Sequence, residues 1–189
     1  AQAQLDQFAG AMASGLSDTT TPGTAATSGA QSGFDVDVGS LSAGNTVSIT
    51  YTDTATNTQH QLTLMRVDDP SALPLKNSAT SNPNDKVVGI DFSGGMASVV
   101  SQINAALSST GMTASNPSGT TLRILDDGAA NTVDVNAVSA TSTATSLTGG
   151  VALPFFVDGS KPYTGAIDSS GPESAGFASR IGVNQSLID

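Results

Sequence analysis

Side chains that could carry out chemistry are few in this sequence. His60 is the only histidine, and cysteine is absent. A Ser/His/Asp relay needs a nucleophile, a base and an orienting carboxylate together, and no Gly-x-Ser-x-Gly segment accompanies His60. The lack of cysteine removes thiol nucleophiles, disulfides and cysteine zinc ligands. We therefore interpret His60 as an exposed residue at the start of a strand.

Two pairs of adjacent carboxylates, Asp68-Asp69 and Asp126-Asp127, are the next candidates. A calcium site needs about six to eight oxygen ligands, and the sequence lacks the regular pattern of a calcium loop. We interpret these residues as turn and strand-edge carboxylates. A weak calcium site near Asp126, Asp127, Asn131 and Asp134 stays open as the alternative. A glycosidase pair has little support, because only 4% of the residues are aromatic and could stack on a sugar.

Gly94-Gly95 lies between an expected strand and an expected helix, which is where phosphate-binding loops occur. Neither the G-x-x-x-x-G-K-[ST] nor the G-x-G-x-x-G pattern is present. We interpret the two glycines as a tight turn. The sequence thus assigns no catalytic, cofactor-binding or metal-ligating residue, and we expect no enzyme activity and no cofactor.

The composition is acidic and rich in hydroxyl groups. The net charge is −10, the six Lys and Arg residues are scattered singly, and Ser and Thr together number 49. Such a chain repels nucleic acid and anionic lipid, so neither is an expected partner. Fifteen Asp accompany a single Glu, a ratio that favours turns and strand edges over helix faces.

The N-terminal segment 3–17 has the periodicity of an amphipathic helix. The apolar side chains on one face are Leu5, Phe8, Ala9, Met12 and Leu16. Residues 19–33 are rich in Thr, Gly and Ser without periodicity, which predicts a linker. We therefore expect the helix to belong to an adjacent module.

Alternating apolar residues predict a β-rich region from Phe34 onward. Strands are expected at 34–38, 46–51, 60–67, 87–92, 112–115, 120–126 and 132–138. The second and third should pair as a hairpin, and residues 68–86 should form a surface loop. A helix capped by Ser93 should begin at Gly94 or Gly95 and end before Gly111. The expected class is α+β, mainly antiparallel, with one covering helix.

Residues 98–138 follow a recognisable pattern. It comprises Ile103-Asn104-Ala105, the segment 111–115, the strand 122–125 and the turn 127–131. This order resembles a module of flagellins and of the flagellar filament cap. In that module the helix covers a small sheet, Asn104 would bond a turn, and the Asp-Gly pair would form a tight turn between strands.

A longer collinear set of segments extends the resemblance over most of the chain. The segments are AQAQLDQFAGAMASGLSD, RVDDPSALPL, PNDKVVGIDFSGG, NPSGTTLRILDDGAANTVDVNA and FASRIGVNQSLID. Together they resemble the hook-associated protein 1 family, in its alphaproteobacterial form. The resemblance implies that 1–18 end an inner helix, 34–168 form an outer domain with the module at about 87–138, and 169–189 return toward the inner domain. The long terminal heptad regions of that family are not in this sequence.

That family joins the flagellar hook to the filament, so the resemblance implies a structural, exported, extracellular protein. Its partners would be further copies and neighbouring axial proteins, namely the hook protein and a second junction protein. The fragment alone is expected to be a monomer, because the polymerising regions are missing. Another axial protein (cap or flagellin) and a calcium-dependent surface adhesin module are the alternatives.

Overall fold

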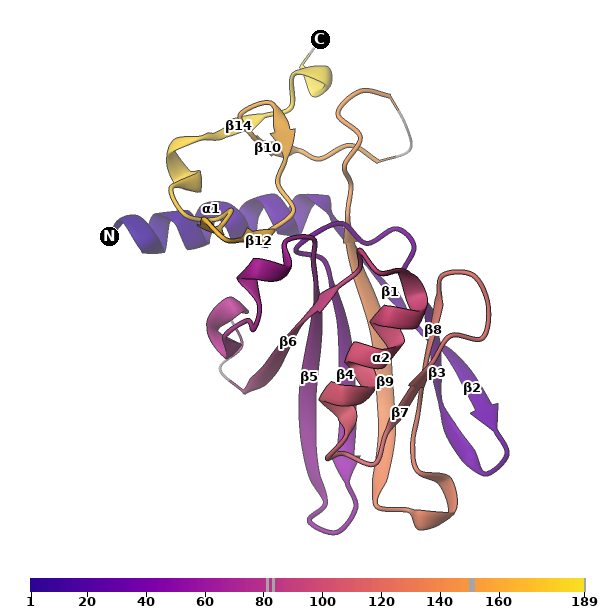
Figure 1. Ribbon diagram of the computed structural model, residues 1–189. Coiled ribbons are helices and arrows are strands. Elements are labelled where there is room, and N and C mark those ends of the chain that lie inside the picture. Colours follow the sequence, from indigo (N-terminus) through magenta and orange to yellow (C-terminus); the bar gives the residue numbers. More distant parts are fainter. Residues whose placement is uncertain (81, 83, 150–151, 189) are drawn as a thin grey trace.

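The computed structural model describes residues 1–80, 82, 84–149 and 152–188. Most of the chain forms a β body, which consists of two large sheets and one helix, α2 (Gly95–Leu107). A smaller terminal unit, made of helix α1 (Gln2–Ser17) and residues 152–188, packs at one end of it (Figure 1). The chain is thus mixed in class and mainly β, in agreement with the expected α+β class.

The β body contains a five-stranded and a four-stranded sheet. The first has the order β1 (Asp18–Pro22), β9 (Val133–Thr143), β4 (Thr46–Asp53), β5 (Thr58–Val67) and β6 (Asp85–Asp91). The second has the order β2 (Thr24–Ser28), β3 (Gln31–Asp37), β8 (Thr121–Leu125) and β7 (Thr113–Ser115). Neighbouring strands are antiparallel except β5 and β6.

The predicted hairpin between β4 and β5 is confirmed. Val47 lies opposite Leu64 and Ile49 opposite Leu62, so the alternating apolar residues share one face as the pattern required. The parallel pairing of β5 with β6 was not predicted. The connection between them carries the short 3₁₀ helices η1 (Pro70–Ala72) and η2 (Asn77–Ala79), and gives the chain the length to return to the same end of the sheet.

Helix α2 encloses the core between the two sheets. Val99, Ile103 and Leu107 are buried and face the core, as the apolar spacing predicted. The prediction that Ser93 caps the helix is wrong. The cap position is Gly94, and Ser93 instead donates its N–H and its hydroxyl to the Asp91 carboxylate, at 2.8 and 2.9 Å.

The expected linker at 19–33 is wrong, because these residues form β1, β2 and the start of β3. The β body therefore begins at Asp18. Gly23 is the point where the chain passes from one sheet to the other. A Cβ there would lie 2.9 Å from the Val138 carbonyl oxygen and 3.0 Å from that of Asp35, so a larger residue would push the sheets apart.

The expected Asp-Gly turn does lie between two strands, but it is a short 3₁₀ helix and not a tight hairpin turn. β8 and β9 lie in different sheets, and the short 3₁₀ helix η3 (Gly128–Ala130) connects them. The positive φ angles of Gly128 and Asn131 let the chain change direction there. The expected hydrogen bonding of Asn104 is present, but its partners are the carbonyl and N–H of Ala114, which lie on strand β7 and not in a turn.

The terminal unit brings together the two ends of the sequence (Figure 1). β10 (Phe156–Asp158) pairs with β11 (Lys161–Pro162) and β14 (Ile181–Val183). A two-stranded ribbon of β12 (Ile167–Asp168) and β13 (Gly171–Pro172) and the 3₁₀ helices η4 (Phe177–Ser179) and η5 (Gln185–Leu187) complete it. Residues 152–168, expected in the outer domain, thus fold with the expected return segment.

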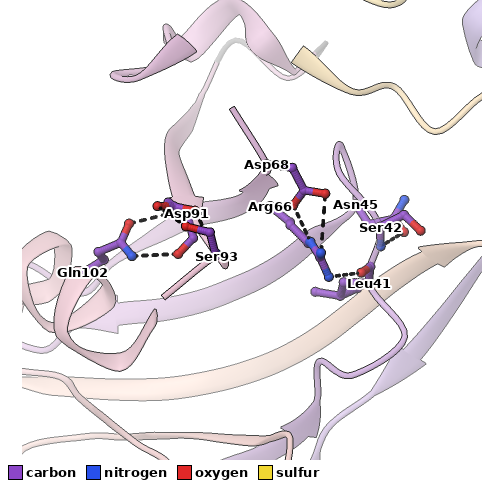
Figure 2. A network of polar contacts seen from close by, with 8 residues as sticks. All are labelled: Leu41, Ser42, Asn45, Arg66, Asp68, Asp91, Ser93 and Gln102. Carbon is purple, nitrogen blue, oxygen red and sulfur yellow. Dashed lines mark hydrogen bonds and ion pairs between the residues drawn. The ribbon is translucent and has the colours of Figure 1, made fainter. Parts of the chain in front are cut away.

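Polar contacts fix the end of the β body that carries the terminal unit. The Thr143 hydroxyl donates to Asp18 Oδ1 at 2.6 Å and accepts from Asn45 Nδ2 at 2.7 Å. Figure 2 shows Arg66 next to this corner, where it donates to the Leu41 carbonyl and to Asp68. These contacts hold the loop that precedes β4.

Replacing Asn104 by alanine should destabilise the protein by about 1–3 kcal/mol, because a buried donor and acceptor of β7 lose their partners. Asn104 Nδ2 donates to the Ala114 carbonyl at 2.9 Å, and Oδ1 accepts from the Ala114 N–H at 2.8 Å. Urea denaturation followed by circular dichroism measures the loss. Ser101→Ala, on the exposed face of the same helix, is the control and should change the free energy of unfolding little.

Candidate interaction surface

Helix α1 buries its small residues and exposes its large ones. The buried positions are Asp6, Ala9, Gly10, Ala13 and Ser17. Leu5, Phe8 and Leu16 are 59%, 64% and 58% exposed. The helix itself was predicted, but of the expected apolar face only Ala9 is buried. The stripe that the sequence suggested as a packing face therefore faces mainly solvent.

Two stacked aromatic rings explain why the small face is buried. Tyr163 and Phe177 stack with their centroids 4.2 Å apart, and both pack against Ala9 and Ala13. A Cβ at Gly10 would lie 2.7 Å from the Tyr163 hydroxyl oxygen. The helix can approach the rings only because position 10 has no side chain.

The Asp6 carboxylate connects α1 to the C-terminal residues. Its two oxygens accept the N–H groups of Gly176 and Ala178, at 2.9 and 3.0 Å. The carboxylate is 8% exposed and supplies acceptors for a 3₁₀ turn that would otherwise present free donors to the helix. Sequence reasoning had missed this residue, since its partners are about 170 positions away.

Negative charges surround Tyr163. Burial, reinforced by Glu173, Asp18 and Asp158, raises the pKa of the Tyr163 phenol to about 12. Glu173, the only glutamate, is itself held in place, because its Oε2 accepts the N–H groups of Thr164, Gly165 and Ala166 at 2.9–3.2 Å. These contacts fix the loop that carries Tyr163 next to the aromatic pair.

An apolar groove of about 300 Å³ runs between α1 and the strands of the terminal unit. Leu5, Phe8 and Met12 line one wall, and Phe156, Ile181 and Val183 line the other. In the part of the chain that the structure describes, all the exposed large apolar side chains belong to the terminal unit: Leu5, Phe8, Leu16, Phe155, Leu187 and Ile188. Apolar groups gathered at one end of a molecule are typical of a protein–protein contact.

His60 lies on the surface of the β body. Its ring stacks on Tyr51 at 5.2 Å near the far end of the β4–β5 hairpin, and it is exposed. A small polar hollow of about 140 Å³ includes both rings together with Asp53 and Lys86. Burial raises the pKa of the Tyr51 phenol, and the negative charge of Asp53 adds a smaller increase. This direction is opposite to the change that would activate a phenol as a base.

The carboxylates considered for calcium bind backbone and hydroxyl groups. Asp126 Oδ1 accepts the N–H groups of Ser32 and Gly128, at 3.0 and 2.8 Å. Asp127 accepts from the N–H and hydroxyl of Thr132, and the hydroxyl bond lowers the pKa of this carboxyl. Asp134 lies exposed on β9. Asn131 has a left-handed backbone conformation between Asp127 and Asp134, and its carbonyl oxygen accepts a hydrogen bond from the Thr54 hydroxyl.

The remaining candidates have structural contacts. Asp68 pairs with Arg66 at 2.8 Å. Asp69 accepts hydrogen bonds from the N–H and the hydroxyl of Ser71 and from the N–H of Ser169. These bonds lower the pKa of the Asp69 carboxyl, and the bond from the Ser71 side chain has the largest effect. Gly94 and Gly95 form the turn that begins α2.

Among the described residues, no three acidic, histidine or cysteine side chains gather as metal ligands would, and no helix is both long and apolar enough to span a bilayer. Comparison with protein families, with curated proteins and with solved structures finds no match for this chain. The apolar groove of the terminal unit is therefore the feature on which a functional proposal can be built.

Replacing Gly10 and Gly15 by alanine should have opposite effects. Alanine favours a helix interior over glycine by about 1 kcal/mol, and a Cβ at Gly15 would meet nothing within 4 Å. Gly15→Ala should therefore stabilise the protein, whereas Gly10→Ala should destabilise it by displacing Tyr163. Urea denaturation followed at 222 nm measures both. Equal stabilisation by the two variants would contradict the close packing of α1 on Tyr163.

The stability of the terminal unit should decrease above pH 10. Folding raises the pKa of Tyr163 from 10.0 to about 12. The neutral phenol therefore contributes stability to the folded state that is fully present below pH 10 and is lost as the pH rises through 12. The total is on the order of 2–3 kcal/mol. Tyr163→Phe should remove this part of the pH dependence of unfolding, while the control Tyr51→Phe should retain it. Equal slopes in both variants would refute the assignment.

Proposed function

We propose that this chain is the outer domain of a flagellar hook-associated protein, located at the junction of hook and filament, with a structural role and no catalysis. The apolar groove of the terminal unit is the observation that carries the proposal. It provides a surface on which the helices of neighbouring axial proteins can pack. The β body then projects outward and braces the junction.

The distribution of charge supports this division of roles. Helix α1 has one charged side chain, Asp6, and this residue is buried. The helix therefore offers an uncharged surface in a molecule of net charge −10, so a close neighbour at this helix meets little local repulsion. The acidic, hydroxyl-rich β body would remain hydrated outside the assembly.

The arrangement of the termini agrees with the resemblance on which the proposal also depends. That resemblance assigns residues 1–18 and 169–189 to the segments connecting inner and outer domains. These two segments pack together through Asp6, which bonds Gly176 and Ala178, and through Phe177 against Ala9 and Ala13, as two chain segments leading to one inner domain would. A chain without cysteine is also suited to export in an unfolded form, because no disulfide can form before export.

Immunogold labelling tests the location. Antibody raised against this fragment should mark a narrow band between hook and filament on intact flagella. Gold at the distal tip would indicate a cap protein, and gold along the filament a flagellin. Label on the cell body alone would overturn the axial proposal in favour of a surface adhesin.

The role of the groove can be tested separately in the full-length protein. Phe8→Ser should reduce incorporation into flagella, measured by immunoblot of isolated filaments with attached hooks, because it removes the largest exposed apolar side chain of α1. Gln59→Ser, on the exposed part of β5, is the control. Normal incorporation of the Phe8 variant would refute the groove as the contact while leaving the location intact.

A further inference from the structure

The two large sheets have four edge strands, β1, β6, β2 and β7. An edge strand carries unpaired backbone groups and can pair with another chain, so proteins usually protect such edges. In this chain the edges differ in how they are protected, and the difference indicates an interaction surface that is separate from the groove.

Side-chain amides occupy the edges of β6 and β7. The Val87 N–H donates to Asn77 Oδ1 at 3.1 Å, and the Asp91 N–H donates to Gln102 Oε1 at 2.9 Å. Figure 2 shows Gln102 reaching from α2 to Asp91. On β7, Asn104 bonds both the N–H and the carbonyl of Ala114. These amides take the place that another strand would occupy.

The edge of β1 is protected by different means. The Gly23 N–H donates to the Val138 carbonyl at 2.7 Å, which places the backbone groups of the preceding residue, Pro22, on the solvent side. Proline has no N–H to offer there. Asp18 adds a negative charge at the other end of the strand.

The edge of β2 has none of these protections. Its sequence, Thr-Ala-Ala-Thr-Ser, contains no charge and no proline, and every residue except Ala26 is exposed. Within the described residues, its only strand partner is β3. The hairpin of β2 and β3 lies at the periphery of the β body in Figure 1, where another molecule can approach.

The turn of this hairpin determines which backbone groups face outward. Gly29 has a φ of 60°, and Ala30 is not left-handed, as in a two-residue type II′ turn. Ser28 and Gln31 then form a hydrogen-bonded pair. The backbone N–H and carbonyl groups of Ala25 and Thr27 therefore point away from β3. The Ser32 carbonyl, opposite Thr27, accepts from Asp126 on the other side of β3, which agrees with this assignment.

We propose that β2 pairs with β2 of a second copy of this chain in an antiparallel arrangement centred on Ala26. Ala25 of each copy then lies opposite Thr27 of the other, and these residues exchange four hydrogen bonds. The contact is symmetric, so one pairing covers the exposed edges of both copies. The four-stranded sheets join into one sheet of eight strands.

The symmetry of the pairing selects a second copy as the partner, and charge permits it at this edge. Two molecules of net charge −10 repel each other, and β2 is an uncharged strand at which they can approach. The nearest carboxylate on the hairpin, Asp35, is neutralised by Arg123 at 2.7 Å. The contact is small, so its dissociation constant is on the order of a millimolar. Isolated molecules therefore stay monomeric when dilute and pair where copies are concentrated, whatever the groove binds.

Cysteine cross-linking tests the pairing and its register, because the chain has no cysteine of its own. Ala25→Cys and Thr27→Cys place thiols on residues that the proposal puts opposite each other, about 5.5 Å apart between Cα atoms. In glutathione redox buffer, an equimolar mixture of the two variants should form roughly tenfold more linked dimer than either variant alone, because aligned thiols have a high effective concentration.

The control is the same spacing on the protected edge strand β1, Thr19→Cys mixed with Thr21→Cys, which should give only the background yield. A ¹⁵N spectrum of the unmodified chain, recorded from dilute to millimolar concentration, should show shifts of the Ala25 and Thr27 amides. Equal cross-linking in all mixtures, a preference for either homodimer, or amides that do not move would each overturn the proposal. No link between copies would overturn the proposal, and a strand of a different protein would then be the partner to test.

Discussion

The close approach of the two sheets at Gly23 is the constraint on which the β body depends. Residues 18–28 run almost without interruption, yet the first half pairs with β9 and the second half with β3. The crossing leaves no room for a Cβ between the carbonyls of Val138 and Asp35. Because one stretch of chain belongs to both sheets, their inner faces enclose one core, which α2 closes.

The terminal unit obeys a different packing rule. Its core is small and depends on the stacked rings of Tyr163 and Phe177, against which only a face of alanine and glycine can fit. The large side chains of α1 are consequently directed outward and form the groove. The exposed face of this helix thus results from how its other face packs. This relation connects the fold to the proposed contact with neighbouring axial proteins.

Polar side chains in this protein mainly complete the backbone hydrogen bonding. Asn104, Gln102 and Asn77 bond sheet edges, and Asp6 and Glu173 accept from partly buried turns. Buried or edge backbone groups need partners, and the many Asp and Asn side chains supply them. The edge of β2 stands out in the described chain, because amides bond the edges of β6 and β7 and Pro22 and Asp18 protect that of β1.

Several local elements of this protein could be predicted from the sequence. Periodicity predicted α1, α2, the β4–β5 hairpin and the apolar face of α2, because each depends on neighbouring residues. The strands within 19–33, the parallel pairing of β5 with β6 and the buried face of α1 depend instead on contacts between distant parts of the chain. Thr and Ser carry no apolar alternation by which a strand could be recognised, and Asp6, Tyr163 and Phe177 act on one another across most of the chain length. Such contacts are invisible to a local pattern, and for that reason the groove could not be predicted from the sequence.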